Sequence, residues 1–232
     1  MRHVSVAALV LAGCGLIDSD IARVNFALPS KTYTFNASAF NLPAGGSPEV
    51  PCGTGQTVAD CCNPPQPLPM PDCTMTQLTC EPNGAGTAVC TAVVNVSVAQ
   101  AVNLSAEVPD LAGATSLVDL RIERIDYAVP SNTLNVDVPP LSLYLAPSGV
   151  TDPSDPRAVK FGTVPLIPAM STPSGTVTPE PNANASLASF AADPATPFAF
   201  IGATTIKVPS GADTPTGAIQ IVVSGQLSVG PF

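Results

Sequence analysis

Apolar residues alternate with polar or small ones in short blocks along most of this chain, as in TAVVNVSVAQ (91–100) and LSLYL (141–145). A period of two places alternate side chains on opposite faces of an extended strand. No segment has a sustained 3.6-residue apolar stripe, and 27 prolines interrupt the blocks. Proline disfavours helix interiors because it lacks a backbone N–H. The pattern therefore predicts an all-β chain of short strands joined by turns.

The chain of 232 residues is long enough to bury a sizeable core. We expect one β-sandwich over residues 21–232, either immunoglobulin-like or jelly-roll-like. A one-residue phase slip near Glu123-Arg124 predicts a β-bulge, and SLASFAA (186–192) is predicted to form a helical turn. The predicted strands are two within 21–40, joined by a turn at Pro29-Ser30, and others at 91–108, 119–129, 134–138, 141–145, 159–164, 198–201, 204–208 and 218–229.

Six cysteines are concentrated in a proline-rich segment at about 45–90, which we expect to be a disulfide-rich insertion in the sandwich. An even number of cysteines in an exported chain indicates disulfides, three if all of them pair. A bond between adjacent cysteines would close a strained ring, but the connectivity is otherwise open. A metal or iron–sulfur site is disfavoured because CxxC spacing is absent. The predicted disulfide residues are Cys52, Cys61, Cys62, Cys73, Cys80 and Cys90.

The chain starts with Met1, Arg2 and His3, followed by an apolar run at 4–12 that only Ser5 interrupts. This run is too short to span a bilayer and is typical of a secretory signal peptide. At its end, Leu11-Ala12-Gly13-Cys14 resembles the lipobox of bacterial lipoproteins. The resemblance implies a signal peptide at 1–13, a lipid on Cys14 that anchors the chain to a membrane, and a tether at 14–20. Gly15, where an aspartate would imply inner-membrane retention, implies the outer membrane, on its periplasmic or surface face. An ordinary secretory signal or a buried N-terminal strand is the alternative.

A second resemblance covers residues 127–178, under a quarter of the chain. YAVPSNTLNVDVPPLSLYLAP (127–147) is followed by FGTVPLIPAMSTPSGTVT (161–178), which is a strand, an Asn-containing turn, a strand, Gly-Thr and a Pro-rich turn. This order is similar to type 2 late-embryogenesis-abundant domains, although the Asn-Pro dipeptide of that family is missing. The resemblance implies an immunoglobulin-like sandwich without catalytic activity.

Removal of the leader would take away His3, the single histidine of the chain. The mature protein would then have neither a Ser-His-Asp triad nor a histidine-bearing zinc site. A Ser–Lys pair stays open with Lys31, Lys160 or Lys207, but none of them lies in a recognisable motif. We therefore expect neither an enzyme nor a cofactor, with a histidine-independent hydrolase as an alternative.

Two groups of carboxylates are candidates for chemistry. Asp119, Arg121 and Glu123 alternate along one strand face, where their charges compensate one another, so a solvated face is favoured over glycoside cleavage. Asp152 and Asp155 precede prolines and lack the regular spacing of a calcium loop, which predicts turn capping.

The net charge and the aromatic content of the chain limit the classes of partner that it can bind. Seventeen acidic residues against eight basic ones make nucleic acid an unfavourable partner. There is no tryptophan, and Tyr33, Tyr127 and Tyr144 are expected in the core or at its edge. The sequence therefore predicts a lipid-anchored envelope protein with a structural or protein-interaction role. The alternative is a carbohydrate-binding or adhesion module, which would require a concave face that bears aromatics or a bound calcium. The candidate partners are therefore another envelope protein or a polysaccharide.

Overall fold

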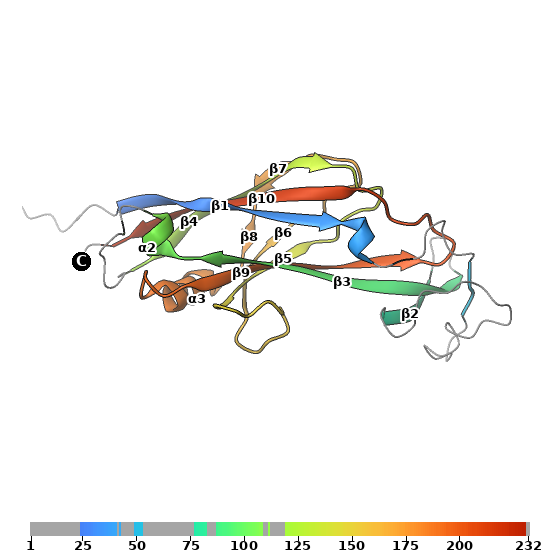
Figure 1. Ribbon diagram of the computed structural model, residues 1–232, viewed down its shortest axis with the longest axis horizontal. Helices are drawn as coiled ribbons and strands as arrows, with labels where there is room; N and C mark the ends of the chain where they lie inside the picture. The colour runs from blue at the N-terminus through green and yellow to red at the C-terminus, as the bar shows by residue number, and fades with distance from the viewer. Residues whose placement is uncertain are drawn as a thin grey trace, which may run out of the picture.

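A computed structural model describes residues 24–40, 42, 49–52, 77–82, 87–108, 111 and 119–230. These residues form a two-layered, elongated β-sandwich, as predicted (Figure 1). Short helices η1 (Ala37–Phe40), α2 (Leu104–Glu107) and α3 (Ala183–Ala191) flank the sheets. The four-stranded sheet has the order β1 (Val24–Asn36), β10 (Ala218–Val229), β4 (Arg121–Asn132) and β7 (Ser174–Thr176). The six-stranded sheet has the order β2 (Gln77–Pro82), β3 (Ala88–Val102), β9 (Phe198–Pro209), β5 (Leu141–Pro147), β6 (Val159–Val164) and β8 (Thr178–Pro179).

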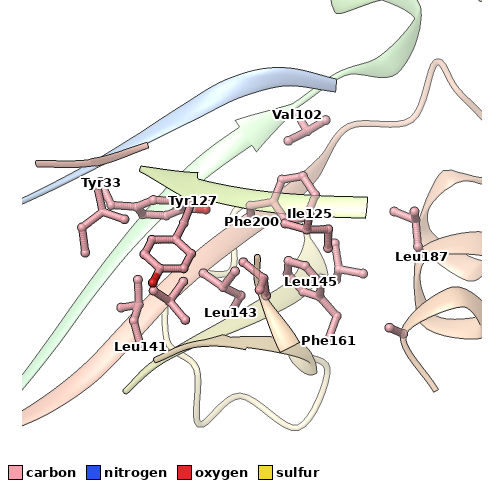
Figure 2. Packing of buried hydrophobic residues seen from close by; sticks show 14 of the residues in the cluster. Tyr33, Val102, Ile125, Tyr127, Leu141, Leu143, Leu145, Phe161, Leu187 and Phe200 are labelled. Carbon is pink, nitrogen blue, oxygen red and sulfur yellow. The ribbon is translucent and has the colours of Figure 1, made fainter. Parts of the chain in front are cut away.

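The core lies between the two sheets and is built from the alternating positions (Figure 2). Leu141, Leu143 and Leu145 of β5 are fully buried, while the residues between them are turned to the other face of the sheet. Tyr33 and Tyr127 lie in the same core, which confirms their predicted position. The predicted faces of these strands are therefore correct.

The segment 24–36 is one strand, although two strands joined by a turn were predicted. Leu28 pairs with Gly225 and Lys31 with Val223, so Pro29-Ser30 form a bulge in β1 rather than a turn. Proline lacks a ladder donor and is tolerated here because β1 is an edge strand. The predicted strands 198–201 and 204–208 are likewise one continuous strand, β9.

The predicted bulge in β4 is confirmed. Arg124 pairs with Gln226 and Ile122 with Leu227, so Glu123 is the extra residue between them. The bulge changes the phase of the strand, and as a result Leu120 and Ile125 both reach the core despite their odd spacing.

Two predicted strand segments are not strands. Residues 134–138 form a loop that contains one isolated bridge, between Val138 and Ile167. The side chain of Asn132 accepts from the N–H of Leu134, and that of Asn135 accepts from the N–H of Thr216. These side-chain bonds replace a strand ladder. At 103–108, the side chain of Asn103 accepts from the N–H of Ala106 and caps α2, so β3 ends at Val102.

The two ends of the sandwich differ. Val24 pairs with Val229, so the start of β1 and the end of β10 lie at one end, together with α2 and α3 (Figure 1). The hairpin of β2 and β3 lies at the opposite end, which is the right-hand end in Figure 1. A small apolar cluster, separate from the main core, packs there and consists of Val50, Cys52, Leu78, Cys90 and Ala92.

This cystine end contains the Cys52–Cys80 disulfide, with Cα atoms 6.0 Å apart. Cys90 is also disulfide-bonded, and since Cys52 and Cys80 pair with each other, its partner lies outside the described residues. Cys14, Cys61, Cys62 and Cys73 lie outside the described residues as well, as do the predicted signal peptide and tether.

Candidate ligand-binding groove

A groove of about 900 Å³ lies on the outer face of the six-stranded sheet. Its floor includes Asn95 and Ser97 of β3, whose neighbouring valines pack against the core. β5 contributes Ser142 and Tyr144, the positions that alternate with its buried leucines. Thr205 of β9 completes this row of polar side chains. The groove is thus the outward counterpart of the period-two pattern that builds the core.

The groove exists because β5 is shorter than β3 and β9 and leaves part of β9 unpaired on that side. β3 and β9 pair from Val102–Phe198 to Thr91–Pro209, whereas β5 pairs with β9 only over Ser142–Pro147. Pro139 and Pro140 precede β5 and lack N–H groups for a longer ladder. The Thr204 hydroxyl donates to the Pro139 carbonyl at 3.2 Å and holds this wall against β9.

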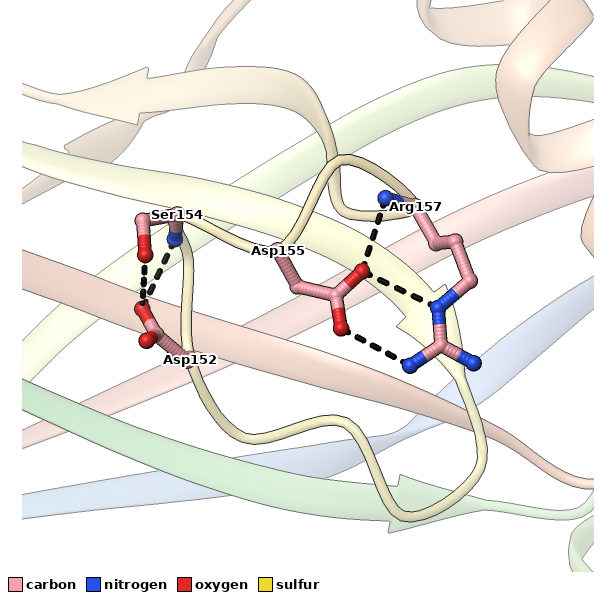
Figure 3. Close-up of polar contacts among 4 residues, drawn as sticks. All are labelled: Asp152, Ser154, Asp155 and Arg157. Carbon is pink, nitrogen blue, oxygen red and sulfur yellow. Dashed lines mark hydrogen bonds and ion pairs between the residues drawn. The ribbon is translucent and has the colours of Figure 1, made fainter.

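The loop between β5 and β6 forms another wall, because Thr151–Ser154 also line the groove. Figure 3 shows Asp152 and Ser154 in this loop. The Asp152 carboxylate accepts from the Ser154 N–H and hydroxyl, both at 2.8 Å, and the backbone bond is the main cause that lowers the pKa of Asp152. Asp155 accepts from the Arg157 side chain and N–H, which lowers the pKa of Asp155 to about 2. Both aspartates cap turns, so that prediction is confirmed.

Several polar groups in the groove are available to a ligand. The hydroxyls of Ser97, Ser142, Tyr144 and Thr151 have no hydrogen-bond partner within the described part of the chain. Asp152 is the one charged side chain among the described residues that line the groove, and its second oxygen, Oδ2, has no partner there (Figure 3). The lining therefore carries many neutral hydroxyl groups and a single negative charge.

Tyr144 is half-buried and differs in this from Tyr33 and Tyr127. It packs against a small cluster of Ala146, Val150 and Ile201 on the outer face of the sheet. Sequence reasoning expected Tyr144 in or beside the core and missed the groove. The available signal was the polar character of the positions that alternate with the β5 leucines.

The lysines considered for Ser–Lys catalysis lie apart from the groove lining, and each forms an ion pair with a glutamate. Within the described residues, none of them is hydrogen-bonded to a serine. The pairs are Lys31–Glu107 at 2.6 Å, Lys160–Glu180 at 2.8 Å and Lys207–Glu81 at 2.6 Å.

The carboxylates of Asp119, just before β4, and of Glu123, within β4, also have side-chain partners. Arg121 pairs with Asp119 at 3.0 Å, as the compensating pattern predicted, and Glu123 accepts from the Ser228 hydroxyl. The described residues include no group of three or more His, Cys, Asp or Glu side chains placed to hold a metal ion. In the same part of the chain the longest helix, α3, has nine residues, and no helix has the length and apolarity needed to cross a bilayer.

Neither a protein-family model nor a curated protein matches the chain. Among solved structures, the chain is similar to one of turnip yellow mosaic virus, at 11% identity and a TM-score of 0.27, over 99% of this chain and 90% of that chain. It is also similar to one of Desmodium yellow mottle tymovirus, at 12% identity and a TM-score of 0.25, over 71% and 93% of the two chains.

Proposed function

We propose that the chain is a lipid-anchored protein of the bacterial cell envelope that binds a partner and catalyses no reaction. The anchor is the lipid predicted on Cys14, in the outer membrane. Two or more acyl chains hold a protein firmly at a bilayer, whereas a single chain holds it only marginally.

The observation that carries this proposal is that the start of β1 and the cystine end lie at opposite ends of the sandwich. Nine residues lie between Cys14 and Val24, so the ten Cα–Cα steps from one to the other can reach at most about 35 Å. A lipid on Cys14 would therefore keep the start of β1 near the bilayer. The cystine end lies at the far end of the twelve-residue strand β9, about 40 Å away. This arrangement suits a protein that presents its outer surfaces and its cystine end to a partner.

The described titratable groups support a binding role over a catalytic one. All three lysines are paired with carboxylates, and the loop aspartates cap turns. A catalytic carboxyl or amine is expected in a cleft with a strongly perturbed pKa. Asp152, the one charged group in the groove, has its pKa lowered by hydrogen bonds from Ser154 and so remains a plain carboxylate.

Metabolic labelling with a fatty acid tests the anchor. In a bacterial host, the wild-type chain should incorporate the label and sediment with the outer membrane. Cys14→Ser should lose the label and appear in the soluble fraction, whereas Ser19→Ala, a matched change in the same tether, should behave as wild type. Equal labelling of the wild type and Cys14→Ser, or no labelling of either, would overturn the proposal.

A carbohydrate-binding module is the second candidate function. The joint exposure of tyrosines that would have favoured such a module is not found, because Tyr33 and Tyr127 lie in the core. The hydroxyl-lined groove beside Tyr144 nevertheless favours this candidate, through a different surface from the one expected.

A further inference from the structure

We propose that the groove on the outer face of β3, β9 and β5 binds an electrically neutral glycan chain. The contacts are the Tyr144 ring, the hydroxyls of Ser97 and Ser142, and the carboxylate of Asp152. This inference rests on the proposed binding role and names the chemistry of the partner and its site.

The hydrogen-bonding groups of the groove match those of a sugar. A serine, threonine or tyrosine hydroxyl both donates and accepts, as a sugar hydroxyl does. Ser97, Ser142, Tyr144 and Thr151 present four such groups without partners in the described part of the protein. The free Oδ2 of Asp152 adds an acceptor that can take a hydrogen bond from a sugar hydroxyl, and bonds to a charged acceptor are the stronger kind.

The charge of the groove selects for a neutral ligand. Neither lysine nor arginine is among the described lining residues, and hydrogen bonds from Ser154 keep the pKa of Asp152 low. Asp152 is therefore ionised at neutral pH, and it repels uronate, phosphate and sulfate groups. The nearby Arg157 is itself neutralised by Asp155 at 2.8 Å.

The apolar part of the groove also suits a sugar better than a peptide. The Tyr144 ring is fixed by packing against the Ile201 cluster and offers an amphipathic surface to the C–H face of a sugar ring. Peptide hot spots bury an aromatic or similarly large side chain in a dry pocket. Here the apolar lining consists of Val96, Ala203 and three prolines, which provide shallow contacts, while the volume of about 900 Å³ lies within the range of ligand sites.

The groove is preorganised by hydrogen bonds among its own lining residues. The Thr205 hydroxyl donates to the Asn95 side chain at 2.8 Å, Thr204 holds Pro139, and Ser154 holds Asp152. Binding would therefore order few additional side chains, which reduces the entropic cost of association.

Isothermal titration calorimetry of the full chain in detergent tests this inference. The neutral probes are maltohexaose, cellohexaose and chitohexaose, and the anionic probe is hexagalacturonate. At least one neutral probe should bind, and the anionic probe should not. Tyr144→Ala should weaken binding at least tenfold, and Asp152→Asn, which keeps the Oδ1 cap for Ser154, at least threefold. Asp213→Asn, in the exposed turn between β9 and β10, is the matched control and should bind as wild type.

If the Tyr144→Ala protein does not fold, the Tyr144→Phe protein still tests the site, because phenylalanine keeps the ring and its packing. It should retain most of the affinity and lose only what the hydroxyl contributes. The inference is overturned if none of the neutral probes binds, if hexagalacturonate binds as tightly, or if folded groove variants bind as wild type. Cys14→Ser protein should bind the glycan normally, so failure of the anchor and failure of the groove are separate results.

Discussion

Tyr33 packs against Gly202 in the interior of the sandwich, and this contact leaves no room for a side chain at position 202. A Cβ there would lie 2.9 Å from Cδ1 and 3.0 Å from Cε1 of the Tyr33 ring. The ring is only 1% exposed and cannot move aside, and the same burial raises the pKa of Tyr33. Gly202→Ala should therefore lower the free energy of unfolding by about 1–3 kcal/mol, measured by urea denaturation.

Gly225→Ala is the control for this substitution. Its Cβ would meet Leu28 Cδ1 at 3.3 Å, and that atom is the end of a flexible side chain. The change in the free energy of unfolding should stay within about 1 kcal/mol. Equal stability of the Gly202→Ala protein and the wild type would contradict the described contact with Tyr33.

Asp155 and Arg157 make a second residue-scale prediction, on pH. The pKa of Asp155 is lowered from 3.8 to about 2, first by the Arg157 side chain and then by its N–H. Because the pKa of Asp155 is lower in the folded state than in the unfolded state, the pairing stabilises the fold above pH 3.8. This stabilisation is lost as the pH falls through about 2. Carbon-13 NMR should find the Asp155 carboxyl titrating near pH 2.

In Arg157→Ala the midpoint should rise but stay below 3.8, because the N–H at position 157 can still donate. Arg121→Ala removes the arginine of a different exposed ion pair, with Asp119, and should leave the Asp155 midpoint unchanged. A midpoint that does not move in Arg157→Ala would show that the pair does not form in solution.

At the scale of elements, local patterns predicted most of the long strands, but they missed β2, β7 and β8. β2 lies in the segment that was predicted to be an insertion, yet it joins the six-stranded sheet beside β3. β6 and β10 occupy the predicted ranges 159–164 and 218–229, and the phase slip located the Glu123 bulge. The prediction failed at 134–138, where the side chains of Asn132 and Asn135 bond the backbone instead. The alternation of apolar and polar residues shows which face of a strand each residue would occupy. It does not show which atoms form hydrogen bonds with the backbone N–H and C=O groups.

The groove was beyond sequence reasoning for a related reason. Its floor depends on which strands are neighbours, and β3, β9 and β5 are far apart in the chain. Polar residues at Ser142 and Tyr144 indicated a wet face but not the loop that walls it. The disulfide framework was predicted from cysteine number, whereas the Cys52–Cys80 pairing required the fold.

The cystine end makes an element-scale prediction. The Cys52–Cys80 bond spans 28 residues, and closing a loop of that length contributes about 3–4 kcal/mol in the chain-entropy model. The bond lies in the small apolar cluster apart from the main core, so its loss should act locally. In the double variant Cys52→Ser/Cys80→Ser, amide exchange should speed up in β2 and at the start of β3, while β5 stays protected.

The amides of Leu143 and Leu145, in the main core, serve as the internal control in the same sample. If β5 exchanged as fast as β2 in the double variant, the cystine end would be part of one cooperative core with the sandwich. That result would contradict the separation of the two clusters.

At the scale of the whole molecule, the edge between the sheets is closed beside the proposed membrane end. Lys31 of β1 donates to the Ala101 carbonyl of β3 at 2.9 Å and to Glu107 of α2 at 2.6 Å. The Gln100 side chain donates to the Thr32 carbonyl at 3.1 Å. These bonds join β1 to the opposite sheet, so a pull on the tether would be shared by both layers.

A tethered sandwich should therefore stand on the bilayer with a defined end outward. Ala195 lies in the exposed loop that precedes β9 and follows α3, and Asp213 lies in the turn that follows β9. The twelve residues of β9 separate these positions by about 40 Å. With a fluorescent non-natural residue at one position or the other, energy transfer to headgroup-labelled lipid in proteoliposomes should be higher from 195 than from 213.

Cys14→Ser protein should show transfer from neither, because it has no acyl chain to insert. Equal transfer from both positions of the lipidated chain would mean that the sandwich lies flat, and higher transfer from 213 would mean that the cystine end faces the membrane. Either result would contradict an outward-facing cystine end, whereas the expected order would place the groove partway along a molecule that stands away from the bilayer.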